Sequence, residues 1–152
     1  MSLCGSYPFI ILIGVFLDQL SKWIAERWLR ETVTVIPHLL EFPLVRNYGA
    51  AYGMFQHQRI FLLGVSLAVM IGCYIFRHAL AQSKSGKWGL SFLYIGAIGN
   101  FIDRLFKGYV VDFIDIQIFP VFNLADMCID AGVLLLIIDH FKTGDRTQTQ
   151  QK

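Results

Sequence analysis

The stretch "FNLADMCIDAGVLLLIID", residues 122–139, is apolar and long, like a membrane-spanning helix, yet it carries three aspartates. At about 1.5 Å of rise per residue, such a helix spans most of the roughly 30 Å hydrocarbon core of a bilayer. An ionisable side chain in that core costs several kcal/mol unless it is paired or hydrated, so each aspartate is a functional candidate. Their positions along the helix then decide what each can do.

The whole chain has the composition of a membrane protein. It has 152 residues, of which 55% are hydrophobic and only 16% charged, and its mean hydropathy of +0.54 is too high for an ordinary soluble domain. A net charge of +2, without a basic run interleaved with aromatics, gives no indication of nucleic-acid binding. The odd cysteine count, Cys4, Cys73 and Cys128, argues against a disulfide framework.

Four segments are long and apolar enough for transmembrane helices: residues 7–24, 60–80, 88–105 and 124–141. Residues 32–45, "TVTVIPHLLEFPLV", are typical of a small sheet, and the "RNYGAAYGMF" segment that follows predicts an interfacial helix. Alternation of Ile114, Ile116 and Ile118 with polar residues predicts an extended segment. We therefore expect one all-α integral membrane domain over residues 1–152, with a small extracytoplasmic β-sheet and an interfacial helix.

Basic residues indicate the orientation of the chain in the membrane. Lysines and arginines lie at the turn between the second and third segments and in the polar tail, residues 142–152. They are Arg77, Lys84, Lys87, Lys142, Arg146 and Lys152. We expect the tail to be disordered. Positively charged loops tend to stay in the cytoplasm. A multi-pass protein with both termini cytoplasmic is therefore predicted.

This topology gathers polar residues at the outer ends of the segments: Asp18, Gln19, Lys22, Asn100, Asp103, Arg104, Asp112, Asp126 and Asp130. Asp18 and Lys22 are four residues apart, so an intrahelical ion pair is the structural interpretation for them. Asp130 lies one turn deeper than Asp126, where a partner on a neighbouring helix is expected. Asp139 lies at the cytoplasmic end, and we assign it no functional role.

Asp112 and Asp126 are then the candidate catalytic pair near the outer leaflet. Two close carboxylates in a low-dielectric site cannot both ionise easily, so one serves as general base and the other as general acid. Two alternatives stay open. Residues 103–115 could bind Mg²⁺ or Mn²⁺ together with Asp126 and Asp130, as in a metal-dependent membrane phosphotransferase, or the chain could be a noncatalytic four-helix partner.

Four blocks in order resemble the lipoprotein signal peptidase family, the type II signal peptidases of the bacterial inner membrane. They are "DQLSK" at 18–22, "VRNYGAAYG" at 45–53, "GAIGNFIDRLFKGYVVDFID" at 96–115 and "FNLAD" at 122–126. The resemblance implies an aspartic endopeptidase that removes the signal peptide from diacylglyceryl-modified prolipoproteins by cleaving before the lipidated cysteine. It also implies a mobile flap in the second block.

The family's two catalytic aspartates fall on Asp112 and Asp126. Its supporting polar residues fall on Asn47, Asn100, Arg104 and Asn123, with Asp103, Asp18 and Lys22 beside them. We further expect a monomer in contact with membrane lipids and its prolipoprotein substrate, with no cofactor, no metal and no nucleic acid. Met127 and Cys128 after the second aspartate depart from the small or hydroxylic residues expected there.

Overall fold

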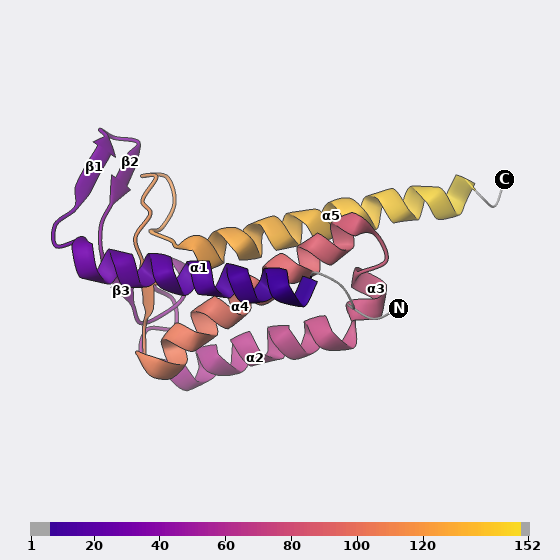
Figure 1. Cartoon of the computed structure of the whole chain (residues 1–152), viewed down its shortest axis with the longest axis horizontal. Helices are drawn as coiled ribbons and strands as arrows, with labels where there is room; N and C mark the ends of the chain where they lie inside the picture. The colour runs from indigo at the N-terminus through magenta and orange to yellow at the C-terminus, as the bar shows by residue number, and fades with distance from the viewer. Residues whose placement is uncertain (1–6, 150–152) are drawn as a thin grey trace.

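A computed structural model describes residues 7–149 of the chain, which are mostly helical (Figure 1). Its long helices are α1 (Tyr7–Trp28), α2 (Arg59–Ile75), α4 (Lys84–Phe106) and α5 (Leu124–Thr149), and one turn of helix, α3 (Arg77–Leu80), follows α2. Each of the four segments expected from the sequence coincides with a helix, although the ends differ. Cys4 and Lys152 lie outside the described residues.

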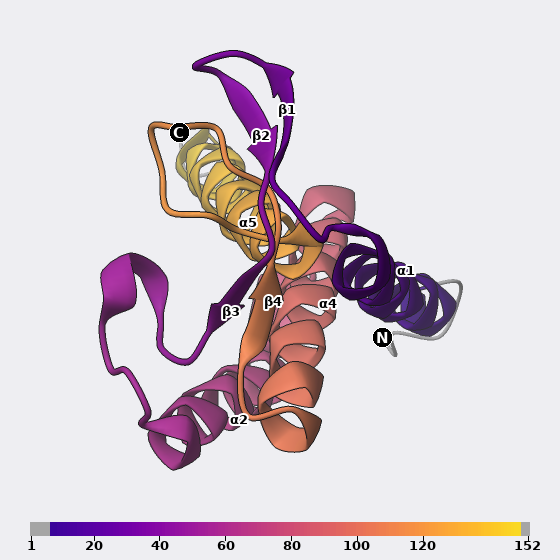
Figure 2. The same ribbon diagram turned by 90° about the vertical axis from the view of Figure 1, so that its left-hand side faces the viewer.

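Helix α4 is the centre of the bundle, because α1, α2 and α5 all pack against it (Figure 2). Its contact with α5 is the most extensive and depends on glycine. A Cβ atom on Gly89 would lie 2.9 Å from the Gly132 carbonyl oxygen, and one on Gly132 would lie 2.8 Å from that of Gly89. Small residues at such positions let two helix backbones approach closely, as in membrane helix pairs.

Helix α1 has the outer surface of a lipid-facing helix. Phe9, Leu12 and Phe16 are each more than 60% exposed. Exposure of several large apolar side chains on one helix is costly in water but not in lipid. By length and composition, α1 is the one helix within residues 7–149 that qualifies as a membrane span, and α2 is apolar but only 17 residues long. Membrane crossing by all four long helices therefore stays a prediction.

Short strands cluster at the end of the bundle where α1 and α4 finish and α2 and α5 begin (Figure 1). Strand β1 (Val33–Ile36) pairs antiparallel with β2 (Leu40–Phe42), and β3 (Val45–Asn47) pairs antiparallel with β4 (Val110–Asp112). The predicted small sheet is thus two two-stranded sheets, joined by an isolated bridge between Glu41 and Asp115. The pairing of β3 with β4 places residues that are far apart in the sequence next to each other at one site.

Three details differ from the sequence expectations. The interfacial helix is a single 3₁₀ turn, Ala51–Gly53, because Tyr52, Phe55 and His57 have φ values of 58°, 55° and 61°, which end a right-handed helix. The second segment breaks at Phe76, whose ψ of 6° departs from helical geometry. The tail expected to be disordered continues α5 through Thr149, since each further residue adds a backbone hydrogen bond.

Candidate active site

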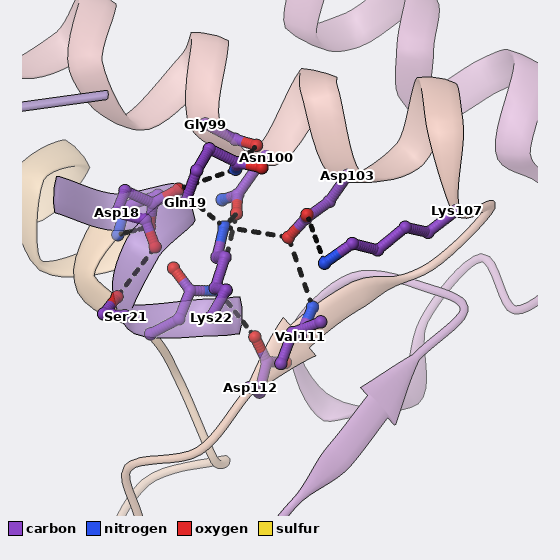
Figure 3. Close-up of polar contacts among 12 residues, drawn as sticks. Asp18, Gln19, Ser21, Lys22, Gly99, Asn100, Asp103, Lys107, Val111 and Asp112 are labelled. Carbon is purple, nitrogen blue, oxygen red and sulfur yellow. Dashed lines mark hydrogen bonds and ion pairs between the residues drawn. The ribbon is translucent and has the colours of Figure 1, made fainter. Parts of the chain in front are cut away.

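Lys22 lies at the centre of a buried polar cluster (Figure 3). Its side chain is fully buried, and its Nζ lies 3.0 Å from Asp18 Oδ2 and 3.0 Å from Asp103 Oδ2. The same Nζ donates a hydrogen bond of 3.0 Å to Asn100 Oδ1. The predicted ion pair of Asp18 and Lys22 is therefore present, and the three acceptors compensate for burial of the ammonium group.

Asp18 connects helix α1 to the first turn of α5. Its Oδ1 accepts a hydrogen bond of 2.9 Å from the Ala125 N–H, one of the amides that a helix start leaves without an intrahelical partner. Gln19 donates from Nε2 to the Gly99 carbonyl at 3.1 Å, which joins α1 to α4. These two contacts fix where α5 begins.

Asp103 holds strand β4 against helix α4. Its Oδ2 accepts from the Val111 N–H at 3.4 Å, and its Oδ1 lies 3.2 Å from Lys107 Nζ. Successive side chains of a strand point to opposite faces, so fixing Val111 also fixes the direction of the next side chain, Asp112. Asp103 therefore helps to fix the position of strand β4.

Asp126 occupies the third position of helix α5 and is fixed by a reciprocal cap. The N–H of Asp126 donates to Asn123 Oδ1 at 3.1 Å, while the N–H of Asn123 donates to Asp126 Oδ2 at 3.2 Å. This is the capping-box arrangement, here formed by the "NLAD" sequence. The positive end of the helix dipole also favours a carboxylate at this position.

Asn123 additionally connects Asp126 to Asp112. Its Nδ2 donates to Asp112 Oδ1 at 2.6 Å, and the other oxygen of Asp112 accepts from Asn47 Nδ2 at 2.9 Å. Asn100 Nδ2 donates to Asp126 Oδ1 at 2.7 Å. Each of the four carboxylate oxygens therefore accepts one N–H group and keeps acceptor capacity for a further partner.

Burial and, less strongly, the nearby charge of Asp126 raise the pKa of Asp112 to about 6, although hydrogen bonds from Asn47 and Asn123 oppose the shift. The Asp112 side chain is only 2% exposed, so desolvation of the carboxylate is the larger cause. A carboxyl group in this environment keeps its proton at pH values where an ordinary aspartate has lost it. Such a group can serve as a general acid.

Both carboxylates line a cavity of about 860 Å³ between α2, α4 and α5. Ala50, Ala51 and Tyr52 of the segment after β3 form part of its wall. Arg104 also lines it and donates from Nη2 to the Gly49 carbonyl at 3.1 Å, while its buried Nε has no hydrogen-bond partner among residues 7–149. The cavity thus combines two carboxyl groups, an available guanidinium donor and largely apolar walls.

The structure brings together the nine residues on which the catalytic and supporting positions of the resembled family fall. They are Asp18, Lys22, Asn47, Asn100, Asp103, Arg104, Asp112, Asn123 and Asp126. What sequence reasoning missed is the wall contributed by α2, whose lining residues are Leu62, Val65, Ser66 and Val69. No signal within that apolar run distinguished its cavity side from its lipid side.

Two further aspartates differ from their expectations. Asp139, which received no role, is buried and accepts hydrogen bonds from Ser83 and, at 2.7 Å, from Ser85, so it joins α5 to the start of α4. Asp130 was expected to pair with a neighbouring helix. Instead it is exposed along the cavity wall, and none of the hydrogen bonds or ion pairs within residues 7–149 uses its carboxylate.

Known proteins show the same architecture and sequence pattern. Residues 10–142 match the family model of signal peptidase (SPase) II. The chain belongs to this family. The lipoprotein signal peptidase of Brevibacillus brevis is 36% identical, with 93% of this chain and 99% of the relative aligned, and that of Caldicellulosiruptor bescii is 42% identical, with 91% and 92% aligned.

Solved structures agree with the family membership. One, described as a bacterial membrane enzyme, has a TM-score of 0.86 at 35% identity and aligns 94% of this chain with 92% of its own. A second with the same description has a TM-score of 0.81 at 36% identity, over 91% and 94%. The chain is therefore a bacterial membrane peptidase, and the aspartic class fits its family.

The metal-dependent alternative is not favoured. The carboxylate oxygens of Asp112 and Asp126 face amide N–H donors, which are suited to an acceptor and not to a cation. Within the described part of the chain, no three His, Cys, Asp or Glu side chains converge as a metal site would require.

Proposed function

We propose that this peptidase removes the signal peptide of diacylglyceryl-modified prolipoproteins by cleaving before the lipidated cysteine, with Asp112 and Asp126 as the catalytic pair. The relatives named lipoprotein signal peptidase support the substrate class. The observation that carries the residue assignment is the double role of Asn123, which binds both carboxylates at the edge of the cavity. A buried and a half-buried carboxyl group held by one amide at a cavity are typical of a catalytic site.

In this mechanism one proton is shared between the two carboxyl groups. The ionised carboxylate accepts a proton from water as the water oxygen attacks the scissile carbonyl carbon. The protonated group donates to the carbonyl oxygen, and the tetrahedral intermediate then breaks its C–N bond as a proton passes to the leaving amine. This is general acid–base catalysis by a carboxyl pair with separated roles.

The surrounding amides and charges orient the pair. Asn100 transmits the position of Lys22 to Asp126, because it accepts from the ammonium group through Oδ1 and donates to the carboxylate through Nδ2. Asn47 anchors Asp112 and also accepts the Gly49 N–H at 2.9 Å, so the segment that covers the cavity and the carboxyl group are held by one side chain. Such preorganisation lowers the cost of reaching the transition state.

The apolar walls suit a hydrophobic signal segment, and the guanidinium group of Arg104, which lines the cavity, suits a carbonyl oxygen of the substrate backbone. The lipid chains on the substrate cysteine would stay in the bilayer, which positions the scissile bond. We place the four long helices across the bacterial inner membrane as a monomer, with both termini cytoplasmic and the carboxyl pair near the outer leaflet. The segment around Ala51 would move as a flap.

The test is cleavage of a lipidated prolipoprotein by purified enzyme in lipid vesicles, with and without a chelator. Asp112→Asn and Asp126→Asn should each abolish measurable cleavage, whereas the matched control Asp115→Asn, in the same outer segment, should keep it. Chelator should have no effect on the unmodified enzyme. Retained cleavage in either folded dyad variant would refute the residue assignment, and loss of cleavage on chelation would favour the metal enzyme.

A further inference from the structure

Asp130 is a carboxylate that the proposed mechanism does not use. It lies four residues after Asp126 on α5, which places it on the same helix face and one turn, about 5.4 Å, further from the strands. Both residues line the same cavity. Unlike Asp126, Asp130 is exposed, and within the described residues its oxygens accept no hydrogen bond.

The cavity around Asp130 is otherwise apolar at this depth. Val65 and Val69 of α2, Leu93 of α4 and Met127 of α5 contribute to its walls. Ser66 is the polar exception, but its Oγ already donates to the Leu62 carbonyl at 3.1 Å. A carboxylate in such surroundings is costly unless a polar group meets it there.

We infer that Asp130 determines substrate specificity by accepting a hydrogen bond from a hydroxyl side chain of the signal peptide. This inference rests on the proposed function, since it requires the signal segment to occupy the cavity. One helical turn corresponds to about two residues of an extended peptide or about four of a helix. The hydroxyl-bearing residue therefore lies two to four positions before the cleaved bond.

A hydroxyl group fits this position better than the other polar groups. Serine and threonine are neutral donors that an apolar segment carries into the membrane at small cost, whereas a substrate carboxylate would be repelled by Asp130. A hydrogen bond to an ionised acceptor is about twice as strong as a neutral one. A site built to bind a hydroxyl also discriminates against an isostere that lacks it, because the carboxylate, once the bound signal segment covers it, is then left unpaired.

The experiment compares isosteric substrates. A lipidated prolipoprotein is prepared with either threonine or valine at each of the positions two, three and four before the cleaved bond. The ratio of kcat/KM for the threonine and valine substrates is measured with the unmodified enzyme, with Asp130→Leu and with the control Val133→Leu, an exposed residue of α5 outside the cavity lining. We expect the ratio to be about ten at one position for the unmodified enzyme and for Val133→Leu, and about one for Asp130→Leu.

An equal ratio in the unmodified enzyme and in Asp130→Leu at all three positions would overturn the inference while leaving the proposed function intact, because both enzymes would still cleave. Failure of the unmodified enzyme to cleave either substrate would instead refute the proposed function itself. Since Asp130 is exposed and binds no other side chain in the described part of the protein, the leucine variant should fold, and its activity on the valine substrate reports this directly.

Discussion

Asn123 performs two tasks that are usually divided between residues. It caps helix α5 through Oδ1 and its own N–H, and it donates from Nδ2 to Asp112. The side chain is fully buried, so none of these groups can be replaced by water at small cost. At the scale of single residues, the stability of α5 and the geometry of the carboxyl pair therefore depend on the same amide.

Replacing Asn123 with alanine should consequently reduce both stability and cleavage. Loss of a cap costs about 1 kcal/mol of unfolding free energy, and loss of a donor that positions the pair should lower kcat by about 100-fold or more. Ser83→Ala is the matched control, because Ser83 caps α4 by accepting the Gly86 N–H at 3.2 Å, far from the cavity. Thermal unfolding and cleavage rates measure the two effects, and an equal loss of kcat in both variants would contradict the assignment.

Asn47 offers a test through pH. Its hydrogen bond lowers the pKa of Asp112, which burial raises to about 6, so Asn47→Ala should raise that pKa further. Asp112 would then keep its proton to higher pH. If Asp112 must be protonated for catalysis, the alkaline limb of the kcat/KM profile should move to higher pH in Asn47→Ala, in addition to any fall in rate. A limb that moves to lower pH, or not at all, would count against Asp112 as the acid.

At the scale of elements, the site depends on how closely the helix ends approach one another. Gly99 of α4 is packed against both α1 and α5: a Cβ atom there would lie 3.0 Å from the Asp18 carboxyl carbon and 3.2 Å from the Ala125 Cβ. These neighbours are themselves hydrogen-bonded to each other. Since neither can move without breaking that bond, the contact leaves no room for a side chain.

Gly99→Ala should therefore lower the free energy of unfolding by about 1–3 kcal/mol and reduce cleavage, because it separates α1 from the start of α5. Gly64→Ala in α2 is the control, since, apart from its chain neighbours and its own helix backbone, no atom of the described residues lies within 4 Å of the added methyl group. Better helix propensity should make that variant neutral or more stable by about 0.5–1 kcal/mol. Chemical denaturation in detergent compares the two, and equal stability would show that α1 and α5 adjust to the added atom.

At the scale of the whole molecule, the strands and the start of α5 lie at the end of the bundle opposite α3 (Figure 1). Asp112 belongs to strand β4 and Asp126 to the first turn of α5, so the carboxyl pair lies at this end as well. Helix α2 runs from the site to the turn that carries Arg77, Lys84 and Lys87, and α4 runs back from it. The site and this turn therefore lie at opposite ends of the bundle. In a membrane orientation with that turn inside, the β1–β2 hairpin would lie outside. The exposed residues His38 of the hairpin and Gln82 of the turn mark the two ends.

Single cysteines at these two positions, in a chain whose three native cysteines are replaced, test this orientation. We expect a membrane-impermeant thiol reagent added to intact bacterial cells without an outer membrane to label His38→Cys but not Gln82→Cys. Both should react after the membrane is opened. The reverse labelling pattern would show that the topology is inverted. Labelling of both cysteines in intact cells would show that the four helices do not all cross the membrane.

The sequence alone was sufficient to locate the helices and to gather the polar residues at one end, because both depend on apolar length and on the alternation of chain direction. It could not predict the 3₁₀ turn at Ala51, since a positive φ is uncommon for a residue other than glycine and nothing in the sequence indicates one at Tyr52. Nor could it predict that Asp130 faces the cavity while Asp139 is buried, since helix rotation is set by packing. The continuation of helix α5 into the polar tail could not be predicted either, since backbone hydrogen bonding extends a helix beyond its apolar residues.

The central claim is that Asp112 and Asp126 act as one catalytic unit on a lipidated prolipoprotein. It is tested most directly by kcat for Asp112→Asn, Asp126→Asn and the double variant, all shown to be folded by thermal unfolding. Residues that act as a unit are not additive, so each single variant should lose about as much activity as the double variant, on the order of 1,000-fold or more. Substantial cleavage by either single variant, or a double-variant loss equal to the product of two partial losses, would contradict the account.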